Sequence, residues 1–332
     1  MTPFSYVRAS SPHEALTAAG ERGSPPASFL AGGTCLLDLM KQGVERPSRI
    51  IDLNFAPDLA AVNLEADGAL HVGAMARLSH VERDPLAAGW PLLREAIVDG
   101  LTPQLRNAAT FGGNISQRPR CIYFREDGFA CNKRRPGSGC AAKAGVHYQH
   151  ALFGGPEVEA CIAVHPSDLC VALTALDARV SLRTSAEART LHIEDFHRLP
   201  GVDPTRETNL RPGELIEAVV IPPQGRRGGA YVKGPEEGFA LVSCAMLFAL
   251  DGGVMSDVRV VLGGVAHKPW RQRAAEAALE GAKPTPAALD AMTEAALTGA
   301  VTDAQTAFRL TLARAVIAEA FERALSRAEA LR

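Results

Sequence analysis

Short apolar segments separated by turn residues fill most of the chain, and Ala-rich segments fill its last part, from about residue 271. Ser11 and Glu14 fit a helix start in which Ser11 is the cap and Glu14 reaches back to it, so a helix is predicted through about Arg22. The next pattern predicts strand, glycine turn, helix and strand at residues 28–31, 32–34, 36–42 and 50–53. This order indicates a small α/β unit.

The pattern then changes twice along the chain. Further apolar runs at 70–72, 171–176, 180–182 and 215–221 are typical of a mixed α+β domain. Residues 222–229, with two prolines and three glycines, are interpreted as a linker that follows this domain. The last part predicts a hairpin of residues 240–250 and 254–262 that turns at Asp251-Gly252-Gly253, and then helices at 271–279, 286–297 and 303–328.

Composition excludes several classes of function. A chain of 332 residues that is 47% hydrophobic can bury a large core in two or three domains. Lys and Arg number 35 against 37 Asp and Glu, so no overall positive field favours nucleic acid. No run of about 18 apolar residues predicts a membrane span, and residues 1–11 lack the pattern of a secretory signal.

Two glycine motifs offer unhindered backbone amides. Gly32-Gly33-Thr34 lies between a predicted strand and a predicted helix, and Thr110-Phe-Gly-Gly-Asn114 follows about 80 residues later. Two such turns can bind one dinucleotide's diphosphate, although an isolated Gly-Gly is more often only a tight turn. Neither motif fits the Rossmann or P-loop pattern, which favours FAD on another scaffold.

Four of the seven cysteines lie close together in the sequence. Cys121, Cys131, Cys140 and Cys161 are separated by nine, eight and twenty residues. Four thiolates suit a tetrahedral zinc ion or an iron-sulfur cluster, and the absence of a C-x₂₋₄-C pair disfavours zinc without excluding it. A 4Fe-4S cluster held by four thiolates is anionic. The basic side chains nearby in the sequence could offset its negative charge; they are Lys133, Arg134, Arg135 and Lys143. The alternative is four unrelated cysteines in a basic surface loop.

The other three cysteines have no predicted function. Cys35 stands at a helix start, which can lower a thiol pKa, but no catalytic partner is near it in the sequence. Cys170 and Cys244 lie in apolar runs and are interpreted as small hydrophobic residues.

Motifs along nearly the whole chain resemble the FAD-binding subunits of the xanthine dehydrogenase, or molybdenum hydroxylase, family. They are residues 3–9, 31–34 followed by 38–41, 106–114, 165–168, 231–233 and 262–271. The resemblance implies an α+β fold with two subdomains of the p-cresol methylhydroxylase type, at 1–57 and 58–223. A C-terminal domain like that of carbon monoxide dehydrogenase flavoproteins would follow at 224–332.

The same resemblance implies a flavin site. The diphosphate would be held by Leu30, Ala31, Gly32, Gly33, Thr34, Cys35 and Leu36 together with Gly112, Gly113 and Asn114. Thr110 and Asp168 would make polar contacts with FAD, Lys233 would approach the isoalloxazine, and Ile216 would lie near the adenine. Without the resemblance, Asp168 equally suits a helix cap and Lys233 an ordinary surface lysine. A cation near the flavin would stabilise its reduced anionic form.

The cysteine segment, about 118–164, is an insertion that most flavin subunits of the family lack. It closely resembles that of periplasmic aldehyde oxidoreductases and more loosely that of 4-hydroxybenzoyl-CoA reductases, which implies that Cys121, Cys131, Cys140 and Cys161 bind a 4Fe-4S cluster. The motifs that match are Cys-x-Tyr-Phe-Arg, Cys-Asn-Lys-Arg-x-Pro-Gly-Ser-Gly-Cys-Ala-Ala and Cys-Ile-Ala-x-His-Pro-Ser-Asp.

The implied function is that of an oxidoreductase subunit. Substrate oxidation would occur at a molybdenum cofactor in one partner and 2Fe-2S clusters would belong to a second, giving a heterotrimer whose FAD passes electrons to an external acceptor. The nearest resemblance implies an aldehyde as the substrate, and purines and other heterocycles are the alternatives. The complex would be periplasmic through a partner's signal, or cytoplasmic. A stand-alone flavin oxidase and a zinc-stabilised scaffold without redox activity are the alternatives.

Overall fold

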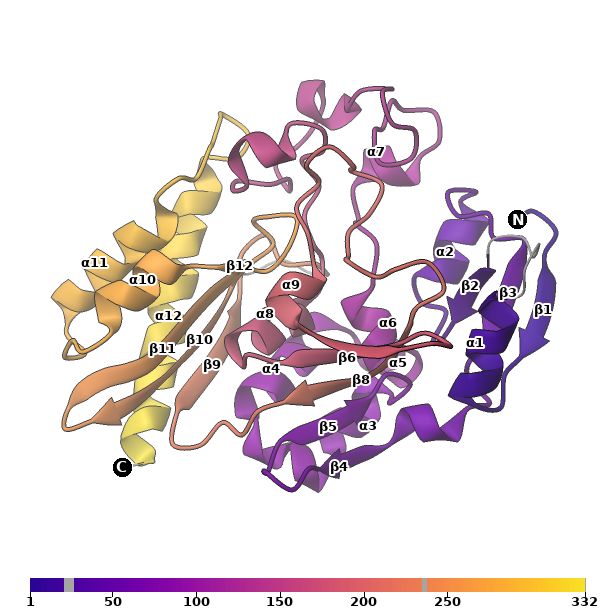
Figure 1. Cartoon of the computed structure of the whole chain (residues 1–332). Helices are drawn as coiled ribbons and strands as arrows, with labels where there is room; N and C mark the ends of the chain where they lie inside the picture. The colour runs from indigo at the N-terminus through magenta and orange to yellow at the C-terminus, as the bar shows by residue number, and fades with distance from the viewer. Residues whose placement is uncertain (21–26, 235–237, 332) are drawn as a thin grey trace.

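The computed structural model describes residues 1–20, 27–234 and 238–331, which form three sheets arranged in a row beneath a cap (Figure 1). The first sheet is parallel, in the order β1-β3-β2, and its elements are β1 Ser5–Arg8, α1 Pro12–Gly20, β2 Ala27–Leu30, α2 Leu36–Lys41 and β3 Arg49–Asp52. These strands and helices confirm the predicted α/β unit.

The start of α1 follows the predicted capping pattern with one difference. Ser11 Oγ accepts the Glu14 amide at 3.2 Å, but the Glu14 carboxylate accepts from the backbone amide of Ser10, at 2.7 Å, instead of that of Ser11. The last predicted residues of this helix, 21 and 22, lie outside the described residues.

The second sheet is antiparallel, in the order β4-β5-β8-β6-β7, and is covered by helices. Its strands are β4 Val62–Leu64, β5 Leu70–Gly73, β6 Arg179–Arg183, β7 Ala188–His192 and β8 Leu215–Ile221. The helices are α3 Leu78–Arg83, α4 Pro91–Gly100, α5 Pro103–Ala108, α6 Phe111–Ile115, α8 Asp168–Ala175 and α9 Ile193–Phe196. The apolar run 171–176 belongs to α8, whose residues are all buried, so its sequence has no polar face.

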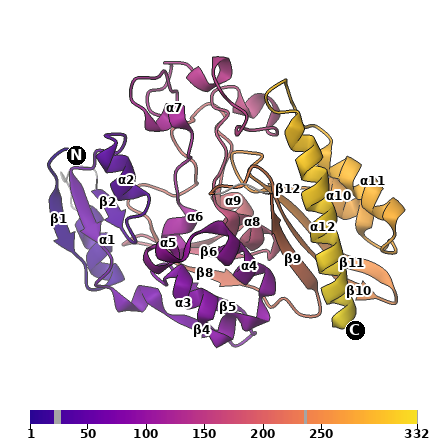
Figure 2. The same cartoon turned by 180° about the vertical axis from the view of Figure 1, so that it is seen from behind.

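The third sheet is antiparallel, in the order β12-β11-β10-β9, and the long helix α12 packs against β9 and β10 (Figure 2). Its elements are β9 Gly228–Lys233, β10 Ser243–Asp251, β11 Val254–Gly263, β12 Trp270–Arg271, α10 Arg273–Leu279, α11 Pro286–Leu297 and α12 Phe308–Ala330. Asp251 pairs with Val254, which confirms the predicted hairpin turn.

Two predicted boundaries in this region are wrong. Gly228 and Gly229 belong to β9 and not to the linker; a Cβ at Gly228 would lie 2.2 Å from the Ala328 backbone nitrogen, so glycine lets α12 approach the strand. The last helix begins at Phe308 and not at Asp303, because the Asp303 carboxylate accepts the amides of the next residues, at 2.9 Å for Gln305, and forms a turn.

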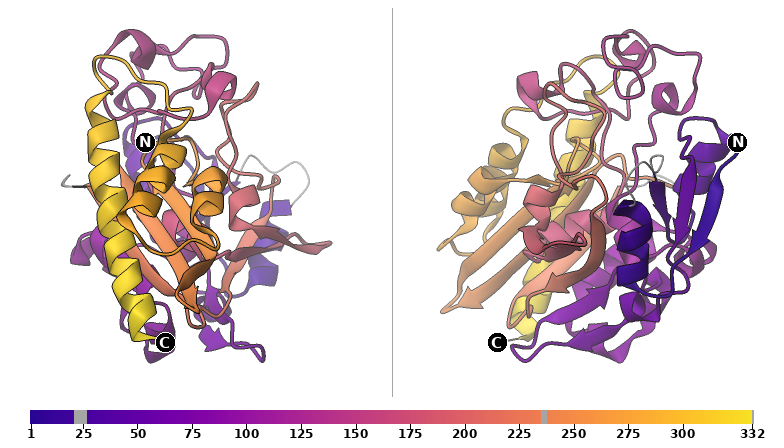
Figure 3. Two further views of the ribbon diagram at one scale, coloured as in Figure 1. Left: turned by 90° about the vertical axis from the view of Figure 1, so that its left-hand side faces the viewer. Right: turned by 45° about the vertical axis from the view of Figure 1, so that its right-hand side comes forward.

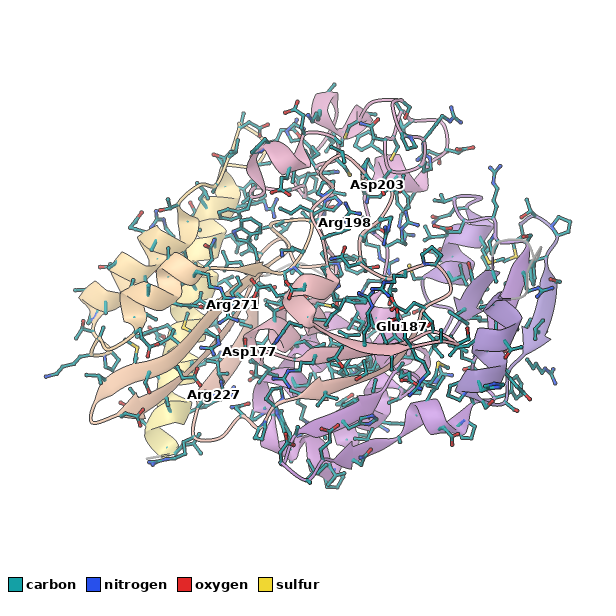
Figure 4. The ribbon with its side chains drawn as sticks, viewed as in Figure 1. Asp177, Glu187, Arg198, Asp203, Arg227 and Arg271 are labelled. Atoms are coloured by element: carbon teal, nitrogen blue, oxygen red, sulfur yellow. The ribbon has the colours of Figure 1, made fainter. Side chains whose placement is uncertain are left out.

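The second and third sheets share one core. Tyr231 and Leu247 of the third sheet pack in the same buried cluster as Leu70 of the second sheet and Leu173 of its helix α8. The second sheet with its helices, and the third sheet with its helices, are called the second and the C-terminal unit. At the edge of this seam, Asp177 accepts from Arg271 at 2.6 Å, and Figure 4 labels both side chains. The two units are therefore held together by apolar packing and by ion pairs.

The four-cysteine insertion forms the cap at one end of the molecule, above the sheets (Figure 3). It contains one turn of α-helix, α7 Ile122–Arg125, and the 3₁₀ turns Ala141–Ala144 and Gly155–Val158, and it is otherwise irregular. Across the described ranges, no helix has the length and apolarity that a membrane crossing needs.

Candidate functional site

The two glycine turns lie directly against each other. A Cβ on Gly32 would stand 2.1 Å from the carbonyl oxygen of Ala108, just before the second motif, and one on Gly113 would stand 3.8 Å from the Cβ of Ala31. A larger residue at Gly32 would push the two turns apart, whereas the distance at Gly113 is an ordinary van der Waals contact. The second turn opens α6, where Thr110 Oγ1 accepts the amide of Gly113 at 3.2 Å.

Both turns line one cavity of about 350 Å³. Of the predicted FAD contacts, those on its wall are Ala31, Gly32, Gly33, Thr34, Cys35, Leu36, Thr110, Gly112, Gly113 and Ile216. Leu30 and Asn114 are not on this wall; the Asn114 side chain accepts instead from Ser167 Oγ at 2.6 Å. The cavity wall therefore offers glycine amides, which suit a diphosphate, and the apolar side chain of Ile216, which suits an adenine.

Asp168 and Lys233 form a second group, joined to the glycine turns through Asn114 and Ser167. Tyr231 Oη donates to one oxygen of the Asp168 carboxylate at 2.5 Å, and Lys233 Nζ lies 3.5 Å from the other. Burial raises the pKa of Asp168 and, more strongly, that of Tyr231. Ser167 and not Asp168 is the cap of α8, since its hydroxyl accepts the Cys170 amide at 3.1 Å. The Asp168 carboxylate is therefore free of a capping role and contacts Lys233 and Tyr231.

A smaller cavity, of about 250 Å³, extends from Asp168 toward the insertion. Cys121 and His150 of the insertion line it, together with Phe239 of the C-terminal unit. This cavity brings the Asp168 side of the site next to one of the proposed cluster ligands.

The four cysteines of the insertion are free thiols that affect one another. Cys131 and Cys140 face each other across an antiparallel bridge. Burial raises the pKa of Cys121 to about 11, with further contributions from Cys131 and Cys140, and it also raises the pKa of Cys161 to about 11. Such thiols stay protonated at neutral pH unless a bound cation stabilises their thiolates.

The four sulfurs of the insertion are not the most compact group of possible ligand atoms among the described residues. Within the described ranges, the one group of His, Cys, Asp or Glu ligand atoms that all lie within 4.8 Å is His165, Cys170 and His197, so no three of the four sulfurs approach that closely.

The buried group of His165, Cys170 and His197 is not a convincing metal site. The nitrogen of His197 that faces Cys170, at 3.8 Å, is Nε2, and it lies 2.9 Å from the Ile115 carbonyl oxygen. A nitrogen that donates to a carbonyl has no free lone pair for a metal. Cys170 and Cys244 are fully buried, as expected of small hydrophobic residues.

The basic residues of the insertion have different partners. The Lys133 ammonium is completely buried, lies 2.9 Å from Glu207 and donates to the Pro204 carbonyl at 2.6 Å. Its charge opposes part of the rise that burial causes in the pKa of Cys161. Arg134 donates to the carbonyls of Tyr123 and Phe124, at 2.6 Å for Phe124. Lys133 therefore supplies charge beside the cysteines, whereas Arg134 holds the loop together.

Sequence reasoning missed two groups of residues at this site. Arg118 lines the larger cavity, donates its backbone amide to Cys35 Sγ at 3.4 Å, and pairs with Glu207 at 2.9 Å. His150 lies 3.3 Å from Cys121 Sγ. Glu207 is 89 residues from Arg118 in the sequence and His150 is 29 from Cys121, so no local pattern relates them.

Comparisons with known proteins show which family the chain is similar to. Residues 2–224 match the FAD binding domain in molybdopterin dehydrogenase, and residues 230–324 match the CO dehydrogenase flavoprotein C-terminal domain. The chain is 44% identical over 284 residues to the aldehyde oxidoreductase FAD-binding subunit PaoB of Escherichia coli, covering 84% of this chain and 86% of that protein.

More distant relatives cover almost the full length. The carbon monoxide dehydrogenase medium chain of Hydrogenophaga pseudoflava is 26% identical over 98% of this chain and 96% of its own. A solved structure of carbon monoxide dehydrogenase from the same organism has a TM-score of 0.76 at 25% identity and covers 98% of both chains. These matches confirm the predicted fold class.

Proposed function

The chain belongs to the FAD-binding subunits of the molybdenum hydroxylase family, and from that premise we propose that it is the FAD- and 4Fe-4S-carrying electron-transfer subunit of an aldehyde oxidoreductase. Membership makes it an oxidoreductase subunit with a FAD-binding domain. The aldehyde substrate, the 4Fe-4S cluster, the partners and the acceptor are the proposed part. Four free thiols that the insertion brings together, with Cys131 and Cys140 paired across a bridge, carry the proposal.

The chain's own residues would bind and orient the flavin. The glycine turns offer amides to the diphosphate, and Ile216 offers an apolar surface to the adenine. Lys233 and Tyr231 both contact the Asp168 carboxylate, which would fix a cation and a polar group near the isoalloxazine. FAD, when bound, would supply the ability to accept and release electrons. A cation at this place would favour the reduced flavin.

The partners are proposed to be a molybdenum-cofactor subunit and a 2Fe-2S subunit in a heterotrimer. Support comes from the relatives, which are named as a FAD-binding subunit and as medium chains of larger enzymes. Electrons would reach this chain from those subunits and leave from FAD to an external acceptor. The purified single chain is therefore expected not to oxidise aldehydes, and sustained turnover without molybdenum would contradict the proposal.

The decisive test is metal and flavin analysis of the chain purified without oxygen. We expect one FAD, about four irons and about four acid-labile sulfides per chain, as a Cys₄ cluster of this kind requires. FAD without iron would favour a flavin oxidase, and zinc in place of iron would favour a scaffold.

Cysteine replacements would then test the ligands one at a time. Replacing Cys121, Cys131, Cys140 or Cys161 by Ser should lower the iron content, because each change removes a soft ligand. The matched controls are Cys170→Ala and Cys244→Ala, whose thiols are buried elsewhere. Full iron in the four ligand variants, with loss in the controls, would refute the assignment.

A further inference from the structure

His150 is a buried imidazole beside one of the proposed cluster ligands. It is 7% exposed, and its Nε2 lies 3.3 Å from Cys121 Sγ. The backbone amides of Tyr123 and Phe124 also interact with this sulfur. Cys121 therefore lies among several hydrogen-bonding groups. Two of them are backbone amides, whereas His150 contributes a side chain that a substitution can remove.

The position of His150 is fixed by the backbone around it. Its amide donates to the His147 carbonyl at 2.9 Å, and the next amide, of Ala151, donates to Ile162 at 2.8 Å. Its carbonyl accepts from the fully buried guanidinium of Arg309, at the start of α12. Arg309 donates further to Leu241, at 2.6 Å, and to Gly264, so it ties the insertion to the C-terminal unit.

The surroundings of the ring also decide which nitrogen carries the proton. Nδ1 of His150 is buried and has no hydrogen-bond partner among the described residues. Nδ1 is therefore unpaired in either neutral tautomer, so the partner of Nε2 decides between them. When Cys121 binds the cluster its sulfur is a thiolate, which can accept a hydrogen bond but cannot donate one. The neutral ring then carries its proton on Nε2 and is the donor to this thiolate.

We propose that His150 raises the reduction potential of the 4Fe-4S cluster by donating Nε2–H to Cys121 Sγ, with Arg309 as the residue that positions it. This inference rests on the proposed function, because it needs the cluster. Reduction adds one electron to the cluster, and no covalent bond forms or breaks. The added negative charge is shared with the ligand sulfurs, so a donor hydrogen bond stabilises the reduced state more than the oxidised state.

The test compares three variants of the full chain, purified without oxygen. His150→Phe removes the donor while keeping a ring, His150→Gln keeps a donor, and His147→Gln is the control, since the His147 ring pairs with Asp303 at 2.5 Å and not with a cysteine. The cluster potential is measured by a titration followed by electron paramagnetic resonance, and the FAD potential by absorbance.

We expect His150→Phe to shift the cluster potential to more negative values at unchanged iron and sulfide content. The cluster potential of His150→Gln should lie between those of His150→Phe and wild type. The FAD potential of all three variants and the cluster potential of His147→Gln should match wild type. A wild-type potential in iron-loaded His150→Phe, or an equal shift in His147→Gln, would overturn the role of His150.

A measurement on the wild-type chain covers the case in which His150→Phe loses its cluster. With ¹⁵N-labelled histidine, the reduced cluster should show a nitrogen hyperfine coupling through the hydrogen bond, and its absence would overturn the inference. Absence of iron and sulfide from the wild-type chain would overturn the cluster proposal itself, so the two failures are distinguishable.

Discussion

Glu207 offers a sharp test of how the insertion is held to the flavin-binding unit. Its carboxylate serves two cations from other segments, with Arg118 Nε and Lys133 Nζ each 2.9 Å from the same oxygen. The side chain of Lys133 is 0% exposed and that of Glu207 is 9% exposed. Glu207→Gln keeps the shape of the side chain but removes its negative charge, so Lys133 is left with uncharged acceptors such as the Pro204 carbonyl.

The expected magnitude follows from burial. Removing one partner of a buried ion pair costs about 3–5 kcal/mol, because the other charge stays buried without compensation. At roughly 2–4 °C per kcal/mol for a unit of this size, the melting temperature should fall by about 6–20 °C. The control is Glu187→Gln in the loop between β6 and β7, labelled in Figure 4, because its pair with Arg211 is 56% and 52% exposed. It should cost at most about 1 kcal/mol, or about 4 °C.

Thermal unfolding of full chains with equal FAD and iron content, followed by circular dichroism at one scan rate, would measure both variants. The double variant Lys133→Met, Glu207→Gln should recover most of the loss, because no unpaired buried charge remains. A Glu207→Gln chain that melts within the range of the Glu187→Gln control would refute the reasoning. So would a double variant that is less stable than Glu207→Gln alone.

Three further outcomes are expected. Gly32→Ala should lower the FAD content, because its Cβ would collide with Ala108, whereas Gly89→Ala, which meets no atom within 4 Å, should not; equal FAD content in both would contradict the role of the turn. FAD should stay in the supernatant after acid precipitation, since no His or Cys stands in a covalent flavin motif; yellow pellets would disprove this. The His147–Asp303 hydrogen bond raises the pKa of His147 and lowers that of Asp303 to about 2. The histidine contribution to stability is therefore present below the unfolded histidine pKa of about 6.5 and is lost as pH rises through the raised pKa of His147. The aspartate contribution is present above the unfolded aspartate pKa of about 3.9 and is lost as pH falls toward about 2. Wild type should exceed His147→Gln in stability most between about pH 4 and 6.5, and a pH-independent difference in unfolding midpoints would refute this.

The local elements and the candidate chemistry could be predicted from the sequence, because both depend on residues that are close in the chain. The two Gly-Gly turns, the hairpin at Asp251 and helix 286–297 follow from local conformational preferences. The spacing of the four cysteines by itself limits the kinds of metal centre that they can bind. The family motifs added the order of the domains.

The tertiary structure decided what those local residues meet. Position 228 needs glycine because α12, about 100 residues later in the sequence, lies against strand β9 there. The residues next to Gly228 in the sequence do not show this contact, so local reasoning places Gly228 in a linker. Asp168 fits a cap by sequence, but Ser167 takes that place, and burial beside Lys233 and Tyr231 determines what Asp168 contacts. His150 and Glu207 meet Cys121 and Lys133 only through folding. Contacts between distant segments set burial, charge pairing and pKa, and those quantities are not properties of a local sequence.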